Sequence, residues 1–396
     1  MGLLRSATYV FSAFIYLNFF VYLFHSIIAK KLGPEGYGEF TVVYSFMFVV
    51  GYLTSLLITV SIKNIIENFS RRYEFLQSLR LVGLLAGVLF ALLGFSMAEI
   101  IRDFLNVKES YYFHIVSLSW LVLFVLVVEK SFLQATDKFG VFALCNGAEI
   151  TIRVIFAYLL LQFGFRVEGA LFSYLMGIIF VLIFLLIRNG GFHFKRAKLD
   201  ISKIIRVALY ASPMGFFIYA DDIFIRRIFE QNTAGIVASV LTVGKFLLWS
   251  VIALLDVFFP KFVETKGSFL FKKHVFQLFI IAIFIEFVMQ ITMQLIGENF
   301  IVLIFGERFK SAYMYLSTYL FALLPLVLSI VFINVAIALE KGILFIYIHA
   351  ICFYLGFLIF KFETVDNYLR YIFAINLPFL IFYFYLFRRE LFLRKS

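Results

Sequence analysis

The chain has 396 residues, of which 63% are hydrophobic and 15% charged, with a mean hydropathy of +1.01. Soluble domains carry about 25% charged residues, so this composition excludes a soluble globular protein and indicates a polytopic membrane protein. The 56 phenylalanines can face lipid as readily as a protein core, so the aromatic runs indicate no cofactor site.

Motifs of cofactor and metal sites do not occur in the sequence. Cys145 and Cys352 both fall in apolar segments, which favours buried small side chains over a disulfide or a metal site. The five histidines form no H-x-x-x-H pattern, and there is no Walker-type phosphate loop. We therefore expect no cofactor, no metal, no ATPase activity and no other enzymatic function.

Apolar segments of the length that a tilted helix needs to cross a bilayer follow one another along the chain. The first lacks the small-residue cleavage site of a signal peptide, so we expect it to remain as a helix. No connection exceeds about 20 residues, which leaves no room for a soluble domain. This pattern predicts an all-α protein with about twelve transmembrane helices, at about 7–29, 40–62, 81–101, 113–133, 142–164, 169–188, 207–229, 236–259, 275–297, 313–339, 343–360 and 369–387.

Lys and Arg are distributed unequally over the two sides of these predicted helices. About 22 of the 35, Arg80 and Lys130 among them, fall in loops on the side of both termini, and about 11 fall on the other side. Cytoplasmic loops of membrane proteins carry such an excess, so we expect an inner (plasma) membrane protein with both termini in the cytoplasm. The bias also explains the net charge of +11 without nucleic-acid binding.

The most basic connection, RNGGFHFKRAKLDISKIIR at 188–206, follows six predicted spans and precedes six more. We interpret 189–206 as a cytoplasmic linker between an amino-terminal bundle, 1–188, and a carboxy-terminal bundle, 207–396. Many transporters are built from two such repeats, with the substrate site at their interface. A weak internal sequence similarity between the halves supports the division. In each half a basic pair precedes a glycine at the start of the next helix: Lys30 and Lys31 before Gly38, and Arg226 and Arg227 before Gly235.

The seventh predicted span is apolar enough to cross a bilayer but carries four charged residues towards its far end. Asp222 and Arg226 stand four residues apart, so on a helix they share a face and can neutralise each other. Asp221 and Arg227 need other partners or water. Two interpretations remain open: the charges anchor the helix at the membrane interface, or the helix lines a hydrated cavity.

Polar residues also lie inside the fifth and eighth predicted spans. Asn146, Glu149 and Arg153 form one stripe, in which Glu149 and Arg153 can pair with each other. Lys245 and Asp256 stand nearly on one face, and Lys245 has no carboxylate three or four residues away. The sequence therefore offers Lys245 no local partner.

Two further polar stripes lie in the ninth and first predicted spans. Glu286, Gln290 and Gln294 recur at steps of four, which favours hydrogen bonds between helices. Asn18 and His25 share a face of the first span and are candidates for lining a cavity, although a single membrane His more often bonds to a neighbouring helix.

Four short sequence segments, two in each half of the chain, resemble the polysaccharide flippases of the multidrug/oligosaccharidyl-lipid/polysaccharide exporter superfamily. They are LGPEGYGEF after the first span, QATDKFG at 134–140, SPMGFFIYADDIFI at 212–225 and IFGERFKSA at 304–312. The resemblance implies two six-helix bundles related by a pseudo-twofold axis, which open alternately to each side of the membrane. It implies a cavity lined chiefly by the first, second, seventh and eighth helices. Some relatives have fourteen spans, and the shorter chain weakens a match to the peptidoglycan-precursor branch.

The cargo implied by this resemblance is an isoprenoid-pyrophosphate-linked oligosaccharide, which crosses from the cytoplasmic to the outer leaflet for biosynthesis of surface polysaccharides such as O-antigen. Contact with polysaccharide assembly enzymes would accompany that role. A pyrophosphate inside the membrane needs cationic and polar groups in a wet cleft. We therefore expect five residues to bind the substrate: Arg153, Arg226, Arg227, Lys245 and Asn18.

Transport without a nucleotide-binding motif must draw on an ion gradient or on the gradient of the cargo. A membrane carboxylate is the usual group that couples an ion to a conformational change. We therefore expect H+ or Na+ to bind at Asp222, Asp256 or Asp221.

Two other function classes remain open. A cation-coupled multidrug exporter of the same superfamily would have an aromatic and acidic cavity, and the three aspartates keep this alternative open. A membrane-embedded glycan polymerase or glycosyltransferase would need an extended outer loop with acidic, basic or Arg residues, and the short connections argue against it.

Overall fold

The structure is a computed structural model that describes residues 3–191, 197–199, 213–339 and 341–391. At some positions inside the helices, Asp256 among them, only the backbone is described. These ranges are helical and contain no strand, and they form two compact units, residues 1–212 (unit 1) and 213–396 (unit 2). Most of the predicted basic linker lies outside the described residues.

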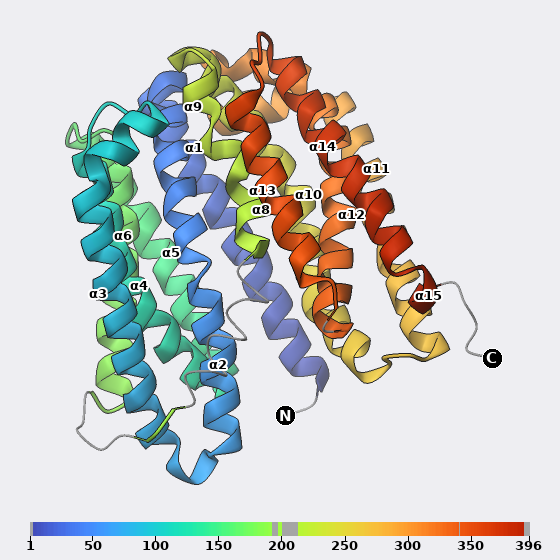
Figure 1. The fold of residues 1–396 in the computed structure, drawn as a ribbon. Coiled ribbons are helices and arrows are strands. Elements are labelled where there is room, and N and C mark those ends of the chain that lie inside the picture. Colours follow the sequence, from blue (N-terminus) through green and yellow to red (C-terminus); the bar gives the residue numbers. More distant parts are fainter. Residues whose placement is uncertain (1–2, 192–196, 200–212, 340, 392–396) are drawn as a thin grey trace. The chain divides into compact units, whose positions relative to one another are not determined.

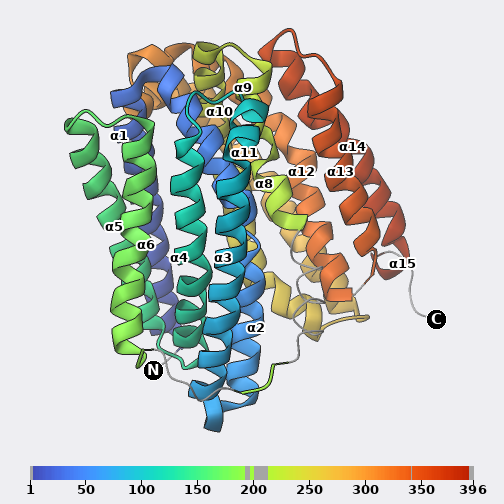
Figure 2. The same cartoon turned by 60° about the vertical axis from the view of Figure 1, so that its left-hand side comes forward.

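Most long helices that follow one another within a unit run antiparallel, whereas α2 continues the direction of the helix before it (Figures 1 and 2). Unit 1 contains α1 (Leu3–Gly51), α2 (Thr54–Glu67), η1 (Phe69–Arg71), α3 (Arg72–Leu105), α4 (Tyr111–Ala135), α5 (Phe139–Gln162) and α6 (Val167–Arg188). Unit 2 contains α8 (Pro213–Ile223), α9 (Ile225–Ile228), α10 (Gln231–Glu264), α11 (Phe269–Phe305), η2 (Glu307–Ala312), α12 (Tyr313–Leu339), α13 (Ile343–Ile359), α14 (Val365–Leu386) and α15 (Arg388–Leu391).

The predicted spans fall on helices wherever the structure describes them. Eight of the described helices are long and apolar enough to cross a membrane. The prediction of an all-α polytopic membrane protein is therefore confirmed.

Three predicted spans differ in detail from the observed helices. The first and second are joined in α1, where Gly33 interrupts the helical backbone with φ 69° and ψ −178° just before Pro34. A positive φ is strained for residues with a Cβ atom, so glycine is the residue that permits this break. The seventh is divided, because α8 ends at Ile223 and α9 begins at Ile225.

Small residues allow α3 to approach α4 closely in unit 1. A Cβ atom on Gly83 would lie 2.7 Å from the backbone oxygen of Phe124, and one on Gly87 would lie 2.9 Å from that of Leu121. Ala91, Gly94 and Ala98 continue this buried face at helical spacing. Small residues in this pattern are typical of helix interfaces within membranes, where close backbone approach provides the packing.

The centre of unit 2 is α12, which is buried along most of its length. It packs against α10, α11 and α14, so residues on different faces of this one helix can belong to different polar sites. Two such sites do occur on α12, and they are described below.

Candidate functional site

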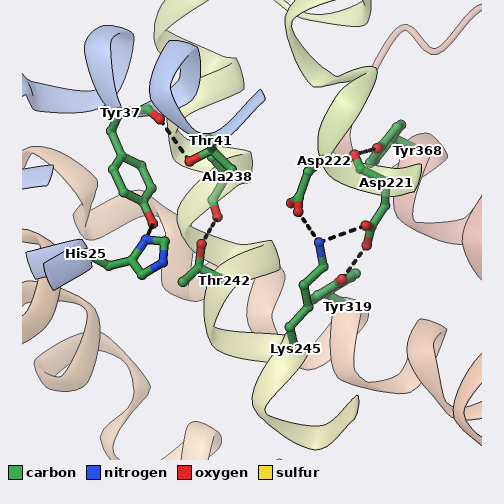
Figure 3. Close-up of polar contacts among 10 residues, drawn as sticks. All are labelled: His25, Tyr37, Thr41, Asp221, Asp222, Ala238, Thr242, Lys245, Tyr319 and Tyr368. Atoms are coloured by element: carbon green, nitrogen blue, oxygen red, sulfur yellow. Dashed lines mark hydrogen bonds and ion pairs between the residues drawn. The ribbon is translucent and has the colours of Figure 1, made fainter. Parts of the chain in front are cut away.

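Two aspartates, one lysine and one tyrosine form a buried cluster in unit 2, here called the Asp–Lys cluster (Figure 3). The Nζ atom of Lys245 on α10 lies 3.0 Å from Oδ1 of Asp221 and also donates a hydrogen bond to Oδ2 of Asp222. The Tyr319 hydroxyl on α12 donates to Oδ2 of Asp221 over 2.5 Å. The Tyr368 hydroxyl on α14 donates to the backbone carbonyl of Asp221. Residues of α10 and α12 therefore bind the carboxylate of Asp221, and α14 binds its backbone.

The three charged groups of this cluster are buried. Asp221, Asp222 and Lys245 are only 1%, 4% and 6% exposed, so water screens them little. Two ionised carboxylates and one ammonium leave a net charge of −1 among these three groups. Two carboxylates beside one ammonium group can accept a proton or a small cation.

The break between α8 and α9 places the aspartates at the end of α8. Asp222 pairs with Lys245 from another helix, and the pair of Asp222 and Arg226, four residues on, stays a prediction. Lys245 has no partner close by in the sequence, and its two partners lie more than 20 residues earlier in the chain. Arg226 is buried in α9, and the neighbouring Arg227 is exposed. The side chain of Asp256 lies outside the described residues.

A second cluster, here called the Arg–Glu cluster, lies in unit 1 and has a buried Arg153 among half-buried partners. Arg153 donates from Nη2 to Oε1 of Glu149 over 2.7 Å and from Nη1 to the Tyr44 hydroxyl over 3.0 Å. Lys130 donates from Nζ to Oε2 of Glu149 over 2.6 Å and to Oδ1 of Asn146 over 2.7 Å. The predicted pair of Glu149 and Arg153 is confirmed. Two cations and one carboxylate give this cluster a net charge of +1, opposite in sign to the Asp–Lys cluster.

The polar residues of the first helix lie on α1. His25 is buried, and its Nδ1 atom lies 3.0 Å from the hydroxyl of Tyr37, across the break at Gly33 (Figure 3). Thr41 donates to the backbone carbonyl of Tyr37 over 2.9 Å and holds the next turn of the helix. Asn18 is half-buried. His25 therefore bonds across the kink that separates the first two spans.

Several residues of these clusters gave no signal in the sequence. Tyr319 and Tyr368 lie in apolar helices among many other aromatic residues, and nothing near them in the chain marks them as partners of Asp221. Lys130, counted among the loop cations, lies inside α4 and pairs with Glu149. His349 on α13 is fully buried, with Nε2 2.9 Å from Oδ1 of Asn376.

Comparisons with known proteins agree with this architecture. No protein-family model matches the chain, and no curated protein sequence matches it. Among solved structures, the chain is similar to the inward-facing conformation of a multidrug resistance MATE family transporter of the MOP superfamily, with a TM-score of 0.76 and 13% identity over 95% of this chain and 94% of that one. The chain has the fold of a MATE transporter.

Two further solved structures share the MATE fold. The outward-facing conformation of a multidrug resistance MATE family transporter gives a TM-score of 0.61 at 14% identity, over 96% of this chain and 95% of that one. A MOP superfamily transporter from Pyrococcus furiosus, whose binding pocket of reverse polarity suggests a different function, gives 0.54 at 14% identity over the same shares. The MATE fold is thus known in both inward- and outward-facing states.

Proposed function

We propose that this protein is a secondary transporter that exports amphipathic compounds by alternating access, with the Asp–Lys cluster as the site where a proton or sodium ion is exchanged for cargo. The observation that carries the proposal is the pair of buried carboxylates that both contact the Lys245 ammonium group. Structural neighbours described as multidrug transporters in two facing states support it. Transport, and not catalysis, is the activity that follows.

The mechanism rests on two buried carboxylates that both contact one ammonium group. An ionised carboxylate at membrane depth costs at least about 2.5 kcal/mol unless it is compensated, so Asp221 and Asp222 together favour capture of one cation beside Lys245. Capture adds a positive charge to the cluster and lets the unit adopt a state that the cluster without the captured cation disfavours. The membrane potential contributes about 2.3 kcal/mol per elementary charge per 100 mV, enough to bias the two facing states more than tenfold.

Transport assays in proteoliposomes test this coupling. An imposed proton or sodium gradient is expected to accelerate transport of a cationic fluorescent dye by about tenfold or more, and Asp222→Asn is expected to remove the acceleration. Asp366→Asn, at an exposed aspartate in the first turn of α14, is the matched control and should keep it. If neither gradient changes the native rate, the ion-exchange role of the cluster is refuted.

A second candidate function is supported by the Arg–Glu cluster. Its net positive charge, together with the flippase-like phrases of the sequence, fits an anionic cargo such as a lipid-linked oligosaccharide for polysaccharide biosynthesis. Arg153, Arg226, Arg227, Lys245 and Asn18 are the proposed substrate-binding residues. Because two carboxylates already bind Lys245, we expect Arg153 to contribute more than Lys245 to the binding of an anionic cargo. Polysaccharide assembly enzymes would be partners only under this second function.

Transport assays in the same proteoliposomes distinguish between the two cargos. The reverse-polarity pocket of the Pyrococcus furiosus neighbour suggests that pocket charge distinguishes functions within this fold. Faster transport of a labelled lipid-linked oligosaccharide than of the dye, with loss of that transport in Arg153→Ala, would select the flippase. The reverse order of rates would select the exporter of amphipathic cations.

We propose that the protein lies in the inner (plasma) membrane with both termini in the cytoplasm. The excess of Lys and Arg in the loops on the side of the termini indicates this orientation. With Cys145 and Cys352 replaced by Ser, a single cysteine at Asp200 is expected to escape a membrane-impermeant maleimide in intact cells. A cysteine at Glu363, between α13 and α14, should react. Labelling in the opposite pattern, or an extracytoplasmic reporter active after Ser396, would reverse the orientation.

A further inference from the structure

A second polar site in unit 2 lies between α11, α12 and α14, apart from the Asp–Lys cluster. It is a pocket of about 570 Å³, within the range of about 300–1,000 Å³ that is typical of small-molecule sites. Ser317 and Thr318 line it and directly precede Tyr319, so one turn of α12 serves both sites. Its other polar lining residues are Glu286, Gln290, Gln294 and Arg370.

Two opposite charges line this pocket without pairing. Glu286 lies near the middle of α11 and is 8% exposed, yet it makes no hydrogen bond or ion pair with any described residue. Arg370, in the second turn of α14, is exposed and also forms no ion pair within the described part of the chain. The pocket therefore offers an unsatisfied carboxylate and an unsatisfied guanidinium to one ligand.

The polar stripe of α11 is divided between two roles. Gln290 donates from Nε2 to the backbone carbonyl of Ser317 over 2.9 Å, and its Oε1 accepts from the Ser317 hydroxyl over 2.7 Å. The prediction of hydrogen bonds between helices is thus confirmed for Gln290. Both residues line the pocket, but Glu286, one turn away, has no such partner among the described residues.

Apolar surface surrounds the charged groups. Phe321 on α12 is 55% exposed and stacks on Phe373 of α14 with ring centroids 5.0 Å apart, and both rings line the pocket. Phe287, next to Glu286 on α11, is 59% exposed. Because α11, α12 and α14 are all long and apolar enough to span a membrane, an occupant with hydrocarbon chains fits this setting better than a freely soluble one.

We propose that this pocket binds the headgroup of a zwitterionic phospholipid that carries a primary ammonium, such as phosphatidylethanolamine. Glu286 receives the ammonium, and the planar fork of Arg370 binds the phosphate. Phe321 and Phe373 contact the start of the acyl chains. A purely cationic amphiphile would leave Arg370 without a partner, and an anionic lipid would leave Glu286 buried and unpaired, so the zwitterion is the class that satisfies both. The assignment does not depend on the transport function.

Native mass spectrometry of the full-length protein in detergent tests this binding. The probes are phosphatidylethanolamine and phosphatidylglycerol in equal amounts, with acyl chains of different mass. We expect the ethanolamine lipid to be retained about tenfold more than the glycerol lipid, because a charged hydrogen bond contributes about 1.5 kcal/mol or more. Glu286→Gln is expected to bring the ratio close to one, and Arg370→Gln to reduce retention of both lipids about tenfold.

Two exposed residues just before α14 provide matched controls. Glu363→Gln and Lys361→Gln remove the same charges outside the pocket and should leave the lipid ratio unchanged. Size-exclusion profiles and melting temperatures report whether each variant is folded. Arg370 is exposed, so its variant tests the proposal even if the Glu286 variant is not recovered.

Three outcomes would overturn the proposal. Equal retention of the two lipids by the native protein would exclude recognition of the ammonium group. An unchanged ratio in Glu286→Gln, with unchanged retention in Arg370→Gln, would exclude this pocket as the site. Displacement of the lipid by an equal concentration of free phosphoethanolamine would assign the pocket to a soluble zwitterion.

Discussion

Replacement of Lys245 with Met is expected to lower the free energy of unfolding by about 3–5 kcal/mol and to abolish transport. Removing one partner of a buried ion pair leaves the other charges uncompensated, which is the most damaging way to alter such a pair. Here two carboxylates, on Asp221 and Asp222, would remain in a site that is almost closed to solvent. Thermal and denaturant unfolding of the purified protein in one detergent measures the loss.

The neighbouring charges allow a matched design. Lys261→Met removes an exposed lysine from the last turn of the same helix, and we expect it to change stability by less than about 1 kcal/mol. The triple variant Asp221→Asn/Asp222→Asn/Lys245→Met carries no charge at the cluster and should regain most of the lost stability while remaining inactive. A Lys245→Met protein as stable as the native one would show that the carboxylates have another compensating partner.

Arg80→Met is expected to cost about 3–5 kcal/mol of stability in unit 1, for a related reason. Arg80 and Glu129 are both fully buried and form a two-bond pair, with Nε 2.5 Å from Oε1 and Nη2 3.0 Å from Oε2. Glu129 also accepts from Nδ2 of Asn189 over 2.8 Å, and Arg80 donates to the backbone carbonyl of Gly191. The pair thus ties the segment after α6 to α3 and α4.

The proper comparison is with a less buried pair close to the start of α3. Arg71, the exposed last residue of η1, bonds over 2.6 Å to the half-buried Glu74 of α3, so Arg71→Ala should cost no more than about 1 kcal/mol. Arg80→Met combined with Glu129→Met should be more stable than Arg80→Met alone, because no buried carboxylate is left without its partner. Limited proteolysis near residue 191 should accelerate in the single variant. Equal cleavage rates in native and Arg80→Met protein would refute the anchoring role.

The sequence by itself determined the properties that depend on near neighbours along the chain. Hydropathy over about 20 residues located the membrane helices, because the thickness of the bilayer sets that length whatever the tertiary fold. The pair of Glu149 and Arg153 was also predictable from local sequence, since residues four apart meet on any α-helix. The stripe of Gln290 on α11 likewise indicated a bond between helices, although its partner could not be named.

Only the tertiary structure decided which charges meet across helices. Arg80 and Lys130 were counted as loop cations, but both lie inside helices and pair with Glu129 and Glu149. Lys245 had no local partner and receives two from α8, because α10 packs beside it after the chain reverses direction. Nor could the pattern of α11 show that Glu286 lines a pocket while Gln290 is held by Ser317. Apolar helices can pack in many registers of similar energy, and the sequence pattern of one helix does not specify which face of another it will meet.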